Sequence, residues 1–127
     1  MEYPNEPQFE NVDVHVRSPQ DLSALAAALQ KKVHVLHSGR VGRMFHLRFQ
    51  LRGMSPSPAV GARRIGRLVD RLPPPARRLW DDARTRELDF GFSSGLSQTK
   101  EWVLPPDSVA LAVGMNAQIR ITVYPAE

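Results

Sequence analysis

Three histidines in segments that alternate apolar and polar residues are the best candidates in this chain for a reactive site. His15, His34 and His46 each occupy a polar position in a segment that alternates apolar and polar residues, and Asp13 stands two residues before His15. Three imidazoles and a carboxylate that meet on adjacent strands could ligate zinc. Nothing in the spacing requires these segments to be adjacent, so we expect neither a bound metal nor a cofactor.

A serine motif near the middle of the second half is the other chemical candidate. Residues 91–95 read Gly-Phe-Ser-Ser-Gly and match the Gly-x-Ser-x-Gly sequence of a nucleophile elbow. That motif requires a helix directly after the serine and a histidine later in the chain. No helical pattern follows, and the last histidine is His46. Because the chain also has no cysteine, we assign no catalytic residue and expect that the protein is not an enzyme.

The positive charge of the chain is concentrated in one stretch. From Lys31 to Arg86 there are 14 basic residues and three acidic ones, a net charge of +11, whereas the remainder carries −7. Such asymmetry suggests an anionic partner, unless the acidic ends fold over the basic segment and neutralise it. Arginine binds carboxylate and phosphate groups alike, so an acidic protein and a nucleic acid are both candidates. The candidate partner-binding residues are Arg63, Arg64, Arg67, Arg71, Arg77 and Arg78.

Two kinds of periodicity predict the elements that position these side chains. Alternation with a period of two predicts half-buried strands, and apolar residues at helical spacing predict helices that begin at Ser-Pro or Pro-Pro pairs. The predicted strands centre on residues 12–16, 33–35, 45–51, 88–92, 101–104 and 119–123. The predicted helices span about 18–32, 58–72, 76–83 and 105–113. A hairpin loop is expected over 38–43, and Pro73-Pro74-Pro75 is expected to separate the second and third helices.

The resulting order, β-α-β-β-α-α-β-β-α-β, predicts an α+β fold. Clean alternation favours a mainly antiparallel sheet with helices packed on one face and a polar second face. The first part has the element order of a ferredoxin-like split βαβ unit. We expect residues 1–10 to form a flexible arm and residues 11–127 to form a single domain. The polar sheet face is a second candidate surface, represented by His15, His34, His46 and Arg48.

Composition indicates the cellular compartment of the protein and whether it inserts into membranes. The absence of cysteine fits a reducing compartment, and no apolar run approaches the roughly 18–20 residues of a membrane span. The first residues are acidic and rich in proline, unlike a secretory signal. We therefore expect a cytoplasmic protein that does not insert into membranes. An exposed edge strand could pair with a second copy, so monomer and homodimer are both open.

The second half of the chain resembles a group of small bacterial α+β proteins of unknown function. The resemblance is carried by Leu79-Trp80, Glu87–Phe92, Leu104 with the short helix after it, and Ile119–Tyr124. Some related families contain immunity proteins, which bind and neutralise a cognate toxin. The resemblance implies a binding protein rather than a catalyst. We therefore expect a non-enzymatic interaction protein that binds an acidic protein partner, with a toxin-immunity protein as one form of it; the alternative is a nucleic-acid-binding domain that uses the same arginine-rich helices.

Overall fold

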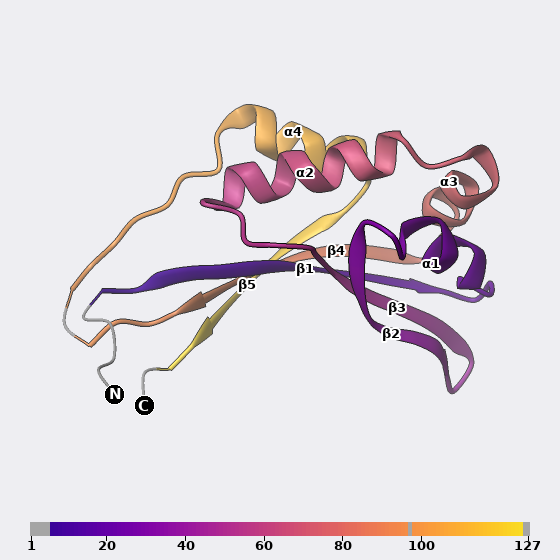
Figure 1. Ribbon diagram of the computed structural model, residues 1–127, viewed down its shortest axis with the longest axis horizontal. Helices are drawn as coiled ribbons and strands as arrows, with labels where there is room; N and C mark the ends of the chain where they lie inside the picture. Colours follow the sequence, from indigo (N-terminus) through magenta and orange to yellow (C-terminus); the bar gives the residue numbers. More distant parts are fainter. Residues whose placement is uncertain (1–5, 97, 126–127) are drawn as a thin grey trace.

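The computed structural model describes residues 6–96 and 98–125, within which the chain forms a sheet and four helices (Figure 1). The strands are β1 (Gln8–Ser18), β2 (Val33–Val41), β3 (Met44–Leu51), β4 (Thr85–Ser93) and β5 (Gln118–Tyr124). The helices are α1 (Ser23–Leu29), α2 (Pro58–Asp70), α3 (Pro74–Asp81) and α4 (Pro106–Gly114).

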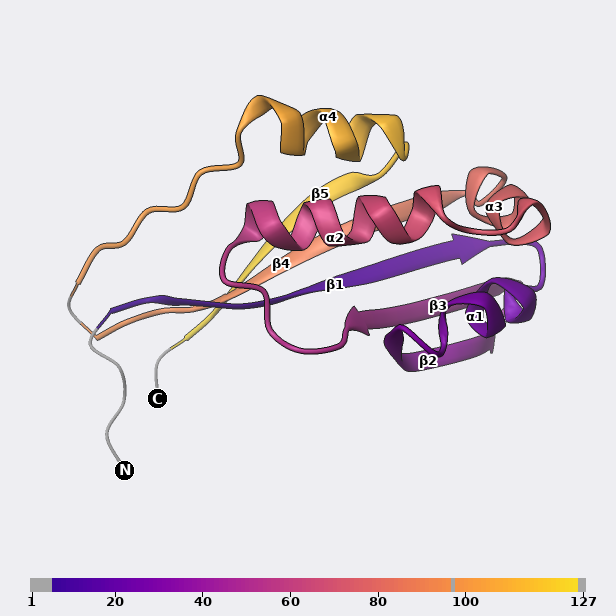
Figure 2. The ribbon, with the colours of Figure 1, turned by 45° about the horizontal axis from the view of Figure 1, so that its top comes forward.

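The strands form one sheet in the order β2-β3-β1-β4-β5. All neighbouring strands are antiparallel except β4 and β5, which are parallel and are joined through α4. The helices lie on one side of this sheet (Figures 1 and 2). The predicted α+β class, with a mainly antiparallel sheet covered by helices on one face, is therefore confirmed. Strand β3 lies between β1 and β2, but the ferredoxin-like assignment of the first part stays a prediction.

The central strand β1 separates an apolar face of the sheet from a polar one. Val12, Val14 and Val16 point to the helices and are buried, whereas Asp13 and His15 lie on the opposite face. The helix-side residues of β3 and β4 continue the buried face on both sides of β1. The alternation that predicted these strands is therefore the alternation of core and open face.

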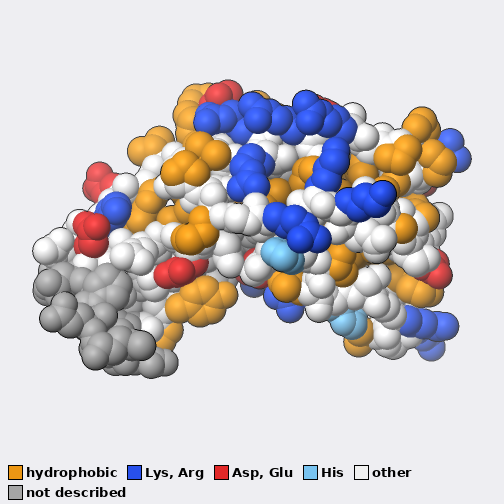
Figure 3. Space-filling view, in the orientation of Figure 1, with side chains coloured by type: hydrophobic (Ala, Val, Ile, Leu, Met, Phe, Trp, Pro, Cys, Tyr) orange, Lys and Arg blue, Asp and Glu red, His pale blue; other side chains and the backbone are white. Residues whose placement is uncertain are grey.

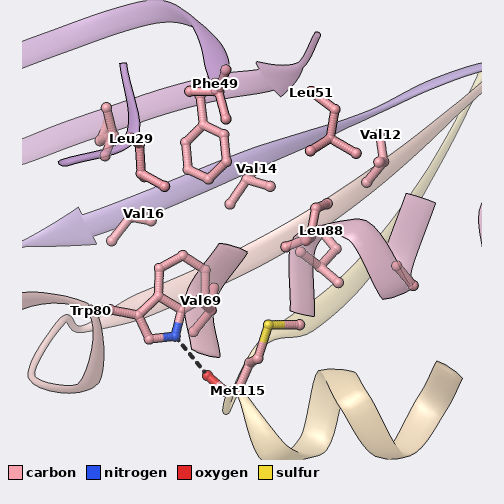
Figure 4. Close-up of a cluster of buried hydrophobic side chains, with 14 of the residues drawn as sticks. Val12, Val14, Val16, Leu29, Phe49, Leu51, Val69, Trp80, Leu88 and Met115 are labelled. Atoms are coloured by element: carbon pink, nitrogen blue, oxygen red, sulfur yellow. Dashed lines mark hydrogen bonds between the residues drawn. The ribbon is translucent and has the colours of Figure 1, made fainter. Parts of the chain in front are cut away.

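The core is completed by side chains of the helices (Figure 4). Trp80 of α3 is fully buried, and its Nε1–H donates to the carbonyl of Met115 at 3.2 Å. This bond satisfies the one polar atom of the indole while the ring packs among the apolar side chains. The predicted start of α2 is confirmed, since the Ser57 side chain accepts a hydrogen bond from the Val60 N–H and Pro58 is the first helical residue.

The predicted strand over residues 101–104 is wrong, and the chain there is irregular. Trp102 and Leu104 pack against the core while Glu101 and Val103 are exposed, which produces alternation without a strand. Both sides of β4 are already occupied, by β1 and by β5, so no edge beside it accepts another strand. Instead, the Trp102 ring packs on Phe92 with their centroids 4.7 Å apart.

Helix α1 begins later than the Ser18-Pro19 pair predicted. Ser18 is buried as the last residue of β1 and is paired with Phe45 of β3, so the strand continues past the expected helix start. Its hydroxyl accepts from the Gln20 N–H, and Asp21 accepts from the Ser23 N–H. These two side-chain-to-backbone bonds form the turn that delays the helix to Ser23.

Two other predicted boundaries change. The loop expected over 38–43 is a tight turn, because Val41 pairs with Met44 and Gly42 has a φ of 63°, a conformation that glycine adopts easily. Residues 8–10 of the expected N-terminal arm belong to β1, and residues 1–5 lie outside the described part of the chain. None of the described helices is long and apolar enough to cross a membrane.

Candidate functional site

The exposed arginines of α2 and of its C-terminal cap form a row along the outer side of the helix. Arg63, Arg67 and Arg71 are exposed and follow one another at four-residue spacing, which places them on one side of the helix. Arg78 of α3 is exposed as well. Among the described residues, none of these four side chains makes a hydrogen bond or an ion pair. We call Arg63, Arg67 and Arg71 the arginine row. Figure 3 shows basic side chains gathered over α2.

Two of the six candidate arginines are engaged within the protein. Arg64 donates to the Ser55 hydroxyl at 2.8 Å and to the Arg52 carbonyl at 2.7 Å, so it fastens α2 to the loop before it. Arg77 lies 3.0 Å from the Asp81 carboxylate and also donates to the Val69 carbonyl near the end of α2. These contacts give both side chains a structural role, which the spacing of arginines in the sequence does not indicate.

Arg86, which contributes to the basic stretch of the sequence, lies in the interior. It is only 5% exposed, and its guanidinium donates to four backbone carbonyls. The acceptors are the carbonyls of Trp80, Asp81, Ala83 and Asn116. Three of these lie at or just beyond the end of α3, where carbonyls have no partner within the helix. Arg86 therefore caps α3 and is not part of a binding surface.

Helix α4, the neighbour of α2, presents an apolar outer surface on the side turned away from α2, because Val109 and Val113 are each about half a turn from Leu111, which contacts α2. Val109 is 42% exposed and Val113 is 72% exposed. These two residues help to line a shallow hollow of about 650 Å³ whose exposed lining is almost entirely apolar. Helices α2 and α4 pack closely: a Cβ atom added at Gly66 of α2 would lie only 3.1 Å from the Leu111 Cδ2 atom of α4. The arginine row and the apolar surface of α4 therefore belong to neighbouring helices. We call these two features together the helical surface.

The open face of the sheet brings together part of the predicted polar set. Strand pairing places His15 opposite Arg48, and Arg17 opposite His46. The imidazoles of His15 and His46 make a hydrogen bond of 3.0 Å between Nε2 and Nδ1. The accepting nitrogen must be unprotonated, so at least one ring of the pair is neutral. His34 also pairs on this face, opposite Gln50, but it has no described contact with the other two histidines.

His37 joins this face because of an irregularity that the sequence pattern conceals. Strict alternation would place His34 and His37 on opposite faces of β2. The register of β2 shifts between Val35 and His37, so that His37 pairs with Arg48. A β-bulge inserts one residue and reverses the alternation beyond it. The spacing of the histidines alone contains no signal for this change.

The described residues show no metal centre and no hydrolase site. No group of three or more His, Asp or Glu side chains among them is arranged to hold a metal ion. Ser93, the serine of the Gly-x-Ser-x-Gly sequence, ends β4 and donates to a Glu10 carboxylate oxygen at 2.8 Å. The next helix in the described chain is α4, which begins only at Pro106, so the strand-serine-helix geometry of an elbow is not formed here.

Acidic side chains on the open face are held by bonds within the sheet. Glu87, opposite His15 on β4, accepts hydrogen bonds from Arg120 and Gln118 of β5. Burial acts to raise the pKa of Glu87, but the hydrogen bonds from Arg120 and Gln118 outweigh it and leave the pKa below its usual value. Asp89 accepts from the Thr122 hydroxyl at 2.7 Å. These bonds tie β4 to the edge strand β5.

We expect the stability of the protein to rise with pH in the range where histidine titrates. Burial is the main cause that lowers the pKa of both His15 and His46, and the charges of neighbouring arginines lower both further. The unfolded chain, in which histidine titrates near 6.5, therefore binds more protons than the folded chain below that pH. The stabilising contribution is complete above pH 6.5 and is lost as the pH falls through the lowered folded-state values.

Thermal denaturation between about pH 7.5 and 5.5 measures this dependence. The melting temperature should fall as the pH is lowered, and it should fall less in a His15→Gln variant. The contribution of Glu87 is lost at lower pH, below the usual carboxyl pKa of 4.5, so the two effects are separable. A variant that keeps the full pH dependence of the wild type would contradict the assignment to His15.

Comparison with known proteins finds no matching family model, no matching curated protein and no matching solved structure. A functional proposal therefore rests on the residues described above.

Proposed function

We propose that the protein is a non-enzymatic binding protein that docks an acidic protein partner on its helical surface. The observation that carries this proposal is a row of arginines, Arg63, Arg67 and Arg71, that have no partner among the described residues and lie on α2, whose neighbour α4 carries an exposed apolar surface. Arginine is enriched at protein interfaces, where apolar contacts form the centre and charges lie around them. An immunity protein that occupies an acidic toxin is one form of this function.

The apolar surface of α4 favours a protein over a nucleic acid as the partner. The affinity of a protein for nucleic acid comes mainly from contacts between its basic side chains and the phosphates. Such a ligand would use the arginine row but leave Val109 and Val113 exposed to water. A protein partner with acidic and apolar side chains would cover both helices. Nucleic-acid binding by the same arginines is the second candidate, and the variants below distinguish the two.

The first experiment is a pull-down from the native lysate with and without nuclease, followed by titration of the captured protein in purified form. Changing Arg63, Arg67 and Arg71 together to alanine should raise the dissociation constant by about 10- to 100-fold. The matched control changes Lys31, Lys32 and Arg43 to alanine, which removes the same charge from exposed positions elsewhere. The control should bind as the wild type does, because net charge alone does not define the docking surface.

A second pair of substitutions tests the identity of the partner. Val109→Ser with Val113→Ser should weaken protein binding but leave nucleic-acid binding unchanged. Recovery of nucleic acid alone, lost after nuclease treatment, would overturn the proposal in favour of the second candidate. Equal weakening by the arginine variant and by its charge-matched control would contradict the assignment to α2.

A further inference from the structure

Four basic or protonatable side chains occupy adjoining positions on the open face of the sheet, on the side away from the helical surface. His15 and Arg17 of β1 lie opposite Arg48 and His46 of β3, respectively. Directly opposed residues on one sheet face have Cβ atoms about 5 Å apart, and long side chains also reach across the diagonals. The hydrogen bond between His15 and His46 shows that one diagonal is in direct contact. We call these four residues the His–Arg cluster.

The two arginines of the His–Arg cluster have no ion-pair partner among the described residues. The Arg17 and Arg48 side chains make no hydrogen bond or ion pair with any described residue, and arginine stays charged at all physiological pH values. Glu87 lies opposite His15, but its two oxygens already accept bonds from Arg120 and Gln118. Like charges at neighbouring cross-strand positions are destabilising. A pair of arginines without a direct partner among the described residues is therefore suited to an external anion.

Three members of the cluster, His15, Arg17 and Arg48, form one wall of a pocket of about 400 Å³ on the open face, and His46 contacts this wall through its hydrogen bond to His15. Among the lining residues that the structure describes, His15, Arg17 and Arg48 stand opposite hydroxyl, amide and carboxylate side chains of β4 and β5. These side chains are Thr85, Glu87, Asp89, Gln118, Arg120 and Thr122. Among the described lining residues there is no Phe, Tyr or Trp ring on which a nucleobase could stack, whereas hydroxyl and carboxylate groups suit the hydroxyls of a polyol.

We propose that the His–Arg cluster binds the phosphate group of a small hydroxyl-bearing phosphate ester. Arg17 and Arg48 supply charge-assisted hydrogen bonds to the phosphate oxygens, and His15 lies beside them as a further donor whose ring is hydrogen-bonded to His46. The remaining polar wall of the pocket faces the hydroxyls of the ligand. The site is separate from the helical surface, so its occupancy does not depend on the proposed docking of a protein.

Proton uptake by the histidine pair should accompany anion binding. In the empty pocket, burial first and then the neighbouring charges of His46, Arg48 and Arg17 lower the pKa of His15, against an opposite effect of Glu87. The pKa of His46 is lowered by burial, then by Arg17 and by His37 of β2. A bound anion offsets the repulsion from these cations and raises both pKa values. Binding should therefore take up protons and become tighter as the pH is lowered.

The test is a titration of the whole protein with sulfate, inorganic phosphate and glycerol phosphate, monitored by the NMR signals of the histidine rings. Sulfate keeps its charge across the neutral range, so its pH dependence reports on the protein rather than on the ligand. We expect saturable shifts of the His15 and His46 signals, tighter sulfate binding at pH 6 than at pH 8, and glycerol phosphate bound more tightly than inorganic phosphate.

Matched variants make the result specific. Arg17→Gln with Arg48→Gln should raise the dissociation constant for phosphate by about tenfold. Lys31→Gln with Arg43→Gln removes the same charge from exposed positions outside the pocket and should leave binding unchanged. Equal binding by these two double variants, or equal shifts of all four histidines, would show a general salt effect and overturn the site. Tighter binding of a single-stranded oligonucleotide that shifts the same histidines would overturn the small-molecule ligand.

Discussion

Replacing Arg86 with methionine is expected to lower the free energy of unfolding by about 2–6 kcal/mol. Methionine retains much of the side-chain volume but has no donor for the four carbonyls that Arg86 binds. Two of those bonds, to the carbonyls of Trp80 and Ala83, are buried at 2.7 and 2.8 Å. Without Arg86 the Trp80 carbonyl would keep the 3.3 Å bond from the Ala83 N–H, whereas the Ala83 carbonyl would lose its described donor. A buried carbonyl left without a partner costs about 1–3 kcal/mol, and each lost bond to a charged donor adds to the effect. Urea denaturation measures the loss.

Two further variants serve as controls for the Arg86→Met measurement. Arg84→Met removes the same charge two residues earlier, from an exposed side chain, and should change stability by less than about 0.5 kcal/mol. Arg86→Lys keeps the charge but loses the planar guanidinium group that binds several carbonyls at once. Its free energy of unfolding should lie between those of the wild type and Arg86→Met. Equal stability of Arg84→Met and Arg86→Met would show that capping of α3 by Arg86 does not stabilise the fold.

The second large effect is expected at Trp80. Trp80→Ala should lower the free energy of unfolding by about 3–5 kcal/mol, because it opens a cavity at the centre of the core and removes the bond to the Met115 carbonyl. Trp80→Phe keeps most of the apolar contact but loses the donor, so a smaller loss is expected. The fluorescence of Trp102 remains available to follow unfolding in both variants.

An exposed apolar residue provides the control for the core. Leu96 is 55% exposed, and Leu96→Ala should leave the free energy of unfolding within about 0.5 kcal/mol of the wild type. If Trp80→Ala were no more harmful than Leu96→Ala, the core would not be organised around α3 as described. If Trp80→Phe were as harmful as Trp80→Ala, the hydrogen bond rather than the cavity would dominate.

Most of the sheet could be predicted because alternation in the sequence directly reflects which face is buried. The strand around Val12–Val16 and the start of α2 at Ser57 and Pro58 depend on local patterns alone. Residues 101–104 show the limit, because alternation cannot reveal whether a neighbouring strand is available for pairing. The register shift between Val35 and His37 likewise arises from pairing with β3.

The candidate site was predictable only in part. The arginine-rich character of α2 follows from composition and spacing, but the bonds that fasten Arg64 and Arg77 depend on carbonyls brought close by the fold. For Arg86 a signal was present. If Leu88 and Phe90 face the core, a period of two places Arg86 on the same inner face. The hydrogen bond between His15 and His46, 31 residues apart, follows from the register of β1 and β3.

The central place of β1 has a consequence for the order in which the chain folds during synthesis. β1 leaves the ribosome before both of its partner strands, and the contact between Glu10 and Ser93 joins residues 83 positions apart. Its two edges must therefore stay unpaired until β3 and then β4 have been made, and its apolar face stays uncovered until α2, which packs on it, has been made. Contacts this distant in sequence slow folding, because a long loop must close before they form. The nascent chain is consequently most exposed to aggregation while β1 awaits β4, and a chaperone that delays collapse would act in that interval.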